Sequence, residues 1–151
     1  MSERVVISGL GVVSSLGCEL DEFWSNLIRG KSGIDKITSF DTSCLDRHYG
    51  GEVKQIKFPK FISSGKFVFL PRTHLFGLVA SLSALRDAGI RNLDEIGIVM
   101  GSIGSGMEFL ERKFDDFNQY PAYMLTANIC NILGLRGPSF ILSCACASGN
   151  Y

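Results

Sequence analysis

The feature that most constrains the fold is the segment Gly137–Tyr151, in which a short apolar run gives way to small residues. After a Gly-Pro turn, Phe140–Leu142 has the length and composition of a buried strand. The small residues that follow allow the backbone to bend sharply and a substrate to come close to it. Cys146 lies among them. If a helix begins near Cys146, its free N–H groups and positive end favour a thiolate there, so the pattern predicts a nucleophile presented by a strand.

A structural interpretation of Cys146 stands beside this chemical one. Cysteine is among the residue types most often buried, and in a strand it commonly acts as a small apolar side chain. The local pattern leaves both interpretations open. A cysteine hydrolase is a third interpretation, and it is disfavoured because neither His48 nor His74 is suitably placed in the sequence to serve as the base.

The segment Cys144–Gly149 closely resembles the active-site segment of the β-ketoacyl-acyl-carrier-protein synthases. In that family a Thr or similar residue usually stands where this chain has Cys144. Three further segments resemble the family's loop before the active site, its opening strand and turn, and its first helix with the following loop: Gly134–Pro138, Arg4–Gly17 and Phe23–Ile34. The resemblance runs through all 151 residues and covers the N-terminal part of the family's domain.

This resemblance implies an α/β fold of the thiolase-like kind, layered α-β-α-β-α, of which residues 1–151 supply most of the N-terminal half. It implies that Cys146 accepts an acyl group from an acyl carrier protein as a thioester, before decarboxylative condensation with a malonyl thioester. A homodimer is implied as well, with residues 139–144 at the contact. No cofactor and no metal are implied.

The resemblance also places two catalytic histidines and a lysine of the family beyond Tyr151. We therefore expect the 151-residue chain alone to be inactive in condensation, and its end around Cys146 to fray. The alternative is a non-catalytic truncated chain, or a half-domain that binds another synthase subunit.

Composition bounds the remaining function classes. Fifteen basic and fifteen acidic residues cancel, so nothing predicts a nucleic-acid partner or a polybasic membrane contact. Five cysteines without paired spacing favour a reduced setting and no metal site. No apolar run is long enough to span a bilayer, and we expect a soluble, cytoplasmic protein that folds as one unit.

Apolar periodicity predicts alternating strands and helices, as in an α/β unit. The expected strands cover residues 4–8, 96–100 and 140–142, and the expected helices cover residues 19–30, 75–88, 108–117 and 120–133, with an irregular stretch from 31 to 68. Trp24 is expected in the core, Gly89 is expected to cap a helix, and His74 is expected to satisfy a helix end.

Two glycine-rich segments match nucleotide-binding motifs only in part. Gly9-Leu10-Gly11 is half of a dinucleotide-binding fingerprint, but the third glycine is missing from its place, so we predict a plain tight turn. Gly101–Gly106 suggests a phosphate cradle, but it lacks the Gly-Lys-Ser/Thr ending, so a turn into a helix is preferred.

Overall fold

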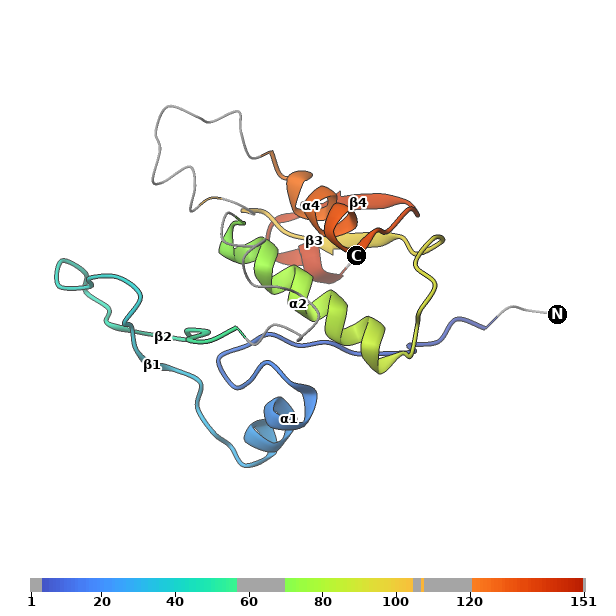
Figure 1. Ribbon diagram of the computed structural model, residues 1–151. Coiled ribbons are helices and arrows are strands. Elements are labelled where there is room, and N and C mark those ends of the chain that lie inside the picture. Colours follow the sequence, from blue (N-terminus) through green and yellow to red (C-terminus); the bar gives the residue numbers. More distant parts are fainter. Residues whose placement is uncertain (1–3, 57–69, 105–106, 108–120, 151) are drawn as a thin grey trace. The chain divides into compact units, whose positions relative to one another are not determined.

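The structure is a computed structural model that describes residues 4–56, 70–104, 107 and 121–150 (Figure 1). The chain divides into two compact units. Unit 1 comprises Met1–Ile62 and Val79–Gly89, and unit 2 comprises Ser63–Leu78 and Ile90–Tyr151. Each unit is described by itself below.

Unit 1 contains helix α1 (Leu20–Ile28), the antiparallel strands β1 (Asp35–Lys36) and β2 (Tyr49–Gly50), and the second half of helix α2 (Arg72–Asp87). The acids Asp21 and Glu22 lie in the first turn of α1, where they interact favourably with the helix dipole. Gly30 follows α1, and Gly89 follows α2, with φ angles of 64° and 67° that favour glycine. Both helices predicted in this region are therefore confirmed.

Residues 4–8 were predicted to form a buried strand, and this prediction is wrong. The segment is assigned to no strand, and the side chains of Val5, Val6 and Ile7 are 99%, 76% and 84% exposed. A strand exists only through hydrogen bonds to a neighbouring strand. Local composition indicated an extended apolar segment, but it carried no information about a pairing partner.

The glycines at positions 9 and 11 serve helix packing instead of the predicted tight turn. A Cβ added to Gly11 would meet the backbone of Ala80 and Ala84 in the second half of α2, so the chain crosses the helix at backbone distance. The Leu10 N–H donates to Asp87 Oδ2 at 2.9 Å on the same helix. The turn itself lies further on, where Ser14 and Gly17 exchange two backbone hydrogen bonds.

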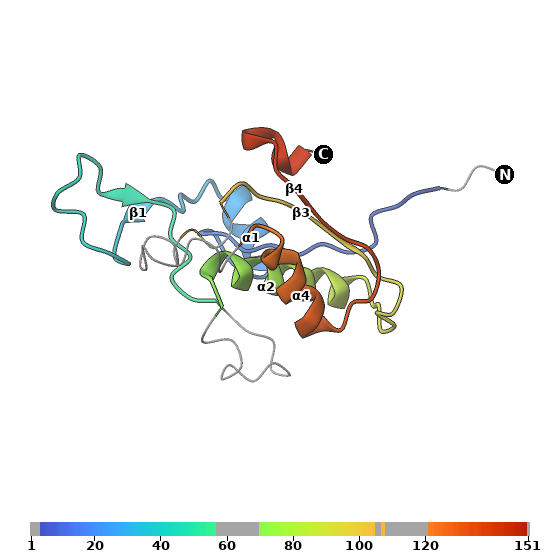
Figure 2. The same ribbon diagram turned by 90° about the horizontal axis from the view of Figure 1, so that it is seen from above.

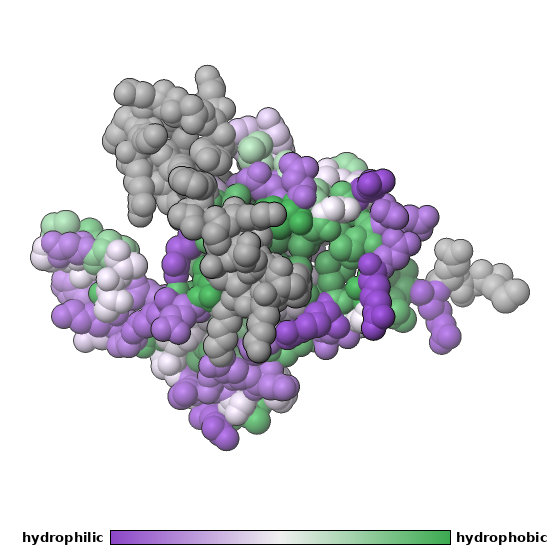
Figure 3. All heavy atoms as spheres, in the orientation of Figure 1, coloured by the Kyte–Doolittle hydropathy of each residue, from purple (hydrophilic) through white to green (hydrophobic). Residues whose placement is uncertain are grey.

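Trp24 was predicted to lie in the core, but its side chain is 61% exposed. Leu27 and Ile28 of the same helix are 45% and 65% exposed. Helical spacing identifies an apolar face but not whether another element covers it. Apolar surface is visible on the face of the molecule drawn in Figure 3.

Unit 2 is built on two parallel strands, β3 (Ile98–Gly101) and β4 (Ser139–Leu142). The strands run side by side in register, with Val99 opposite Phe140 (Figure 2). Helix α4 (Met124–Leu133) packs on both strands and ends at Gly134, whose φ is 74°. The fully or nearly buried apolar side chains of this unit come from α2, β3, α4 and the residue before α2: Leu78, Ile98, Leu125, Ile129 and Pro71.

These elements confirm the strands predicted at 96–100 and 140–142 and the helix predicted at 120–133. The helix predicted near residues 108–117 lies outside the described residues. In the part of the chain that the structure describes, no helix combines the length and apolar character needed to cross a bilayer.

Candidate active site

The candidate nucleophile follows the end of a parallel strand. Strand β4 ends at Leu142, and the short 3₁₀ helix η2 (Ala145–Asn150) begins three residues later. Cys146 is the second residue of η2 and is exposed. Ligands of open α/β sheets bind outside the carboxyl ends of the strands, which is where this arrangement places the thiol. A helix does begin near Cys146, and it is a 3₁₀ helix of six residues.

The residue just before Cys146 has an unusual backbone conformation. Ala145 has a φ of 48°, and it is the one non-glycine residue with a positive φ among those that the structure describes. L-residues other than Gly, Asn and Asp rarely adopt this conformation, which persists only where the surroundings hold it. Such residues concentrate at functional sites. The chain therefore turns sharply at the position that sets the direction of the Cys146 side chain.

Ser148 supplies the contacts that hold this turn. Its side chain is buried, and its Oγ accepts the N–H of Cys144 at 2.8 Å and donates to the carbonyl oxygen of Ala145 at 2.7 Å. The Ala147 N–H also donates to the Cys144 carbonyl at 3.0 Å. The Ser148 hydroxyl is thus hydrogen-bonded to both residues that precede Cys146, Cys144 and Ala145. We name this set of contacts the Ser148 clamp.

The last residue of β3 makes room for the clamp. A Cβ added to Gly101 would meet the Ser148 carbonyl oxygen, would lie 2.6 Å from the Ser148 carbonyl carbon, and would lie 3.0 Å from the Gly149 nitrogen. These are backbone atoms, which cannot swing aside as the end of a side chain can. Strand β3 and η2 therefore approach at backbone distance. The sequence indicated a turn at Gly101 but not this contact.

The remaining thiols occupy different environments. All five cysteines are free: Cys18 is buried, Cys130 is half-buried, and Cys44, Cys144 and Cys146 are exposed. Within the described residues, no group of three His, Cys, Asp or Glu side chains is arranged to hold a metal ion. Cys144 shares the turn of Cys146, two residues before it.

The two histidines lie in different units. His48 Nδ1 lies 3.1 Å from Thr42 Oγ1 in a loop of unit 1. His74, expected to satisfy a helix end, instead joins two helices. It is buried in the first turn of α2, and its Nδ1 lies 2.9 Å from Asn128 Nδ2 on α4. Because an amide NH₂ group donates, Nδ1 accepts and the ring proton is assigned to Nε2.

Burial lowers the pKa of His74 below its ordinary value of 6.5. Near pH 6.5 the His74 side chain therefore takes up a proton in the unfolded chain but stays neutral in the folded chain. The free energy of unfolding consequently falls as the pH drops below 6.5. We expect a slope of up to about 1.4 kcal/mol per pH unit in that window. The Gln side chain in His74→Gln can still accept a hydrogen bond from Asn128. Denaturant titrations of this variant at pH 5 to 8 should give a free energy of unfolding without this slope. His48→Gln should keep it, and an unchanged slope in His74→Gln would refute the assignment.

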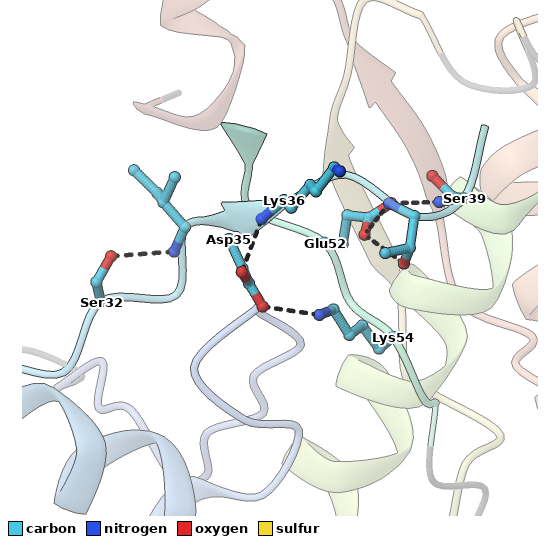
Figure 4. Close-up of polar contacts among 8 residues, drawn as sticks. Ser32, Asp35, Lys36, Ser39, Glu52 and Lys54 are labelled. Carbon is cyan, nitrogen blue, oxygen red and sulfur yellow. Dashed lines mark hydrogen bonds and ion pairs between the residues drawn. The ribbon is translucent and has the colours of Figure 1, made fainter. Parts of the chain in front are cut away.

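A second polar cluster lies in unit 1 around β1 and β2 (Figure 4). Lys54 Nζ lies 2.9 Å from Asp35 Oδ2, which lowers the pKa of Asp35 and raises the pKa of Lys54. Glu52 accepts hydrogen bonds from the N–H groups of Thr38 and Ser39, each at 2.9 Å. Bonds from the Ser39 side chain and from these N–H groups lower the pKa of Glu52 to about 2. No sequence motif indicated this cluster, which joins β1 and the residues just after it to the residues that follow β2.

The pKa of Glu52 falls from 4.5 to about 2 on folding. The hydrogen bonds from Thr38 and Ser39 to its carboxylate therefore stabilise the fold fully above pH 4.5, and this stabilisation is lost as the carboxylate is protonated toward pH 2. We expect the Thr38 and Ser39 amides to exchange hydrogen faster in Glu52→Gln than in the wild type at pH 7. Acidification should then accelerate their exchange, relative to the intrinsic rate, in the wild type only. Glu95→Gln, at an exposed position, is the matched control. Equal protection in wild type and Glu52→Gln would contradict this assignment.

Comparisons with known proteins agree with one another. The profile of "Beta-ketoacyl synthase, N-terminal domain" matches residues 2–151. The 3-oxoacyl-(acyl-carrier-protein) synthase 2 of Synechocystis sp. is 31% identical over 98% of this chain and 40% of its own length. The chain thus spans about two fifths of that relative's length.

Two solved structures show the likeness in fold. The ketosynthase from module 6 of the bacillaene synthase of Bacillus subtilis aligns with a TM-score of 0.73 and 22% identity, over 93% of this chain and 26% of that one. The ketosynthase in a type II polyketide complex with its acyl carrier protein, AntDE:AntF, aligns with a TM-score of 0.66 and 23% identity, over 96% of this chain and 39% of that one.

Proposed function

This chain belongs to the β-ketoacyl synthase family, and on that premise we propose that it carries the acyl-accepting half of a condensing enzyme, with Cys146 as the nucleophile. The observation that carries the proposal is the geometry around the thiol. Cys146 is exposed after the end of β4 and follows a residue with a φ of 48° that the Ser148 clamp holds. A thiol on a sharp, held turn can meet a substrate carbonyl from one fixed direction.

The first step is a thioester exchange. The Cys146 thiolate attacks the acyl carbonyl of a carrier-bound thioester, the new carbon–sulfur bond forms on Cys146, and the carrier thiol leaves with a proton. The negative charge on the carbonyl oxygen needs donors, and the Cys146 N–H is the proposed donor from this segment. A malonyl thioester then loses carbon dioxide, and its carbanion attacks the Cys146 thioester and releases the thiol.

The partner proposed for this chemistry is an acyl carrier protein. The name of the Synechocystis relative refers to an acyl carrier protein, and the AntDE:AntF structure contains one bound to its ketosynthase. A homodimer formed through residues 139–144 remains part of the proposal, supported by the 58% exposure of Phe140 on β4. The cytoplasmic setting also remains a proposal, supported by five free thiols.

The test is acyl transfer in the native protein that contains this sequence. Purified protein is mixed with an acyl carrier protein bearing a radiolabelled acyl group, and protein-bound label is counted after gel filtration. Cys146→Ala should reduce loading by at least about 1,000-fold, because the attacking atom is gone. Cys44→Ala, which removes another exposed thiol, should load as the wild type does. Undiminished loading in Cys146→Ala would overturn the proposal.

A further inference from the structure

The proposed function uses one of the two thiols on the turn after β4. The other, Cys144, lies two residues before Cys146 and is free and exposed in the single chain, at the end of the segment proposed for the dimer contact. The family resemblance places a Thr or similar residue there, so acyl transfer gives no reason for a thiol at position 144. A second thiol beside a reactive one is a common arrangement in proteins that form a reversible disulfide.

The backbone between the two cysteines brings them toward each other. An extended residue between them would hold their Cα atoms roughly 7 Å apart, at the upper limit for a disulfide. Ala145 is instead turned, with a φ of 48°, and the Ala147 N–H donates to the Cys144 carbonyl across this turn. A positive φ at the middle residue shortens the Cα separation to roughly 6 Å. That value lies within the range of about 4.4–6.8 Å in which disulfides form.

The Ser148 clamp fixes this geometry from both sides. Its Oγ accepts from the Cys144 N–H and donates to the Ala145 carbonyl, while the Ala147 N–H donates to the Cys144 carbonyl. The backbone of Cys144 is therefore held at both its N–H and its carbonyl group. The two thiols sit on one fixed turn with their side chains exposed.

We propose that Cys144 is a resolving thiol that protects Cys146 from irreversible oxidation by forming a Cys144–Cys146 disulfide. This inference rests on the proposed function in taking Cys146 as the more reactive thiol. A hydroperoxide oxidises the Cys146 thiolate to a sulfenic acid: a sulfur–oxygen bond forms, the peroxide oxygen–oxygen bond breaks, and the peroxide is reduced to water or an alcohol.

Cys144 then attacks the Cys146 sulfur. The sulfur–sulfur bond forms, the sulfur–oxygen bond breaks, and the hydroxide leaves as water with the proton of the Cys144 thiol. Two thiols thus lose two electrons to one hydroperoxide. The ring closed by two cysteines one residue apart is small and strained, and strained, exposed disulfides are easily reduced. The disulfide is therefore a reversible state in which Cys146 cannot accept an acyl group.

The experiment treats the reduced native protein with hydrogen peroxide, blocks free thiols with iodoacetamide, and maps the products by mass spectrometry. Trypsin cleaves after Arg136, which releases Cys144 and Cys146 together on the peptide that begins at Gly137 and separates them from Cys130. We expect this peptide to lose about 2 Da and to escape alkylation until dithiothreitol is added. Acyl loading should disappear with peroxide and return with dithiothreitol.

Cys144→Ser removes the resolving thiol and keeps its size. In this variant the same peptide should gain about 32 Da as the sulfinic acid forms. For each protein we compare the fraction of its initial acyl loading that returns after dithiothreitol. This fraction should be at least about tenfold smaller in the variant than in the wild type. A wild-type peptide with oxidised Cys146 and alkylated Cys144 would overturn the proposal, as would a disulfide from either residue to Cys130. These readouts concern oxidation, so reduced protein that fails to load acyl groups contradicts the proposed function separately.

Discussion

Replacing Gly101 with alanine is expected to slow acyl loading of Cys146 by about 100-fold, the effect of moving a reacting group by roughly 1 Å. The new methyl group would overlap the backbone of Ser148 and lie 3.0 Å from the Gly149 nitrogen. Because both neighbours are main chain, η2 itself has to move away from β3. Overpacking of this kind also destabilises a fold by about 1–3 kcal/mol.

The measurement is the rate of loading from an acyl carrier protein, read together with a urea unfolding curve. Gly104→Ala is the matched control, because its added Cβ would lie 3.2 Å from Met107 Cγ, part of a flexible side chain that can shift. The control should load at a rate near that of the wild type. Loading by Gly101→Ala at the wild-type rate would show that the approach of β3 to η2 does not set the position of the thiol.

Ser148→Ala is the second large effect that we expect. The substitution removes the hydroxyl that bridges Cys144 and Ala145, and it leaves the Cys144 N–H without this acceptor. Loss of a buried partner of this kind costs about 1–3 kcal/mol. Without the clamp, Ala145 can relax from its positive φ toward commoner conformations, and Cys146 then loses its fixed direction. We expect the loading rate to fall by about tenfold or more.

A purely structural role for Ser148 would lower stability and leave the loading rate of folded protein unchanged. Loading is therefore measured at a temperature where urea titration shows the variant fully folded. Ser148→Thr, which keeps the hydroxyl, should recover part of the rate, while Ser143→Ala, at an exposed position on the same connection, should match the wild type. Equal loading rates in Ser148→Ala and the wild type would show that the clamp does not orient Cys146.

The helices and the two strands of unit 2 could be predicted because their signals are local. Apolar spacing identified α1, α2 and α4, and Gly30, Gly89 and Gly134 follow their ends with positive φ. The family resemblance, read from separated motifs, is confirmed by the profile match over residues 2–151, and the thiolase-like fold by the likeness to solved ketosynthases.

The predictions that proved wrong needed information that is not local. The segment at residues 4–8 is apolar enough for a strand, but pairing depends on a partner elsewhere in the chain. Trp24 has helical spacing, but its burial depends on what covers α1. Gly11 was interpreted as part of a turn, whereas its lack of a side chain serves the crossing with α2.

The candidate site likewise has one part that the sequence predicted and another that it did not. Cys146 was predicted from small residues after an apolar run, and it remains a prediction as the nucleophile. The Ser148 clamp and the approach of Gly101 to η2 were not predicted. A serine two residues after a cysteine has no distinctive spacing, and residues 101 and 148 meet only because β3 and β4 pair in parallel.

The most direct test of the central claim is to locate the acyl group itself. The native protein is loaded from an acyl carrier protein, digested with trypsin under conditions that preserve thioesters, and fragmented in the mass spectrometer. We predict that the acyl mass lies on the peptide that begins at Gly137 and that fragment ions place it on Cys146 and not on Cys144. An acyl group on Cys144, on any other peptide, or on none would contradict the account.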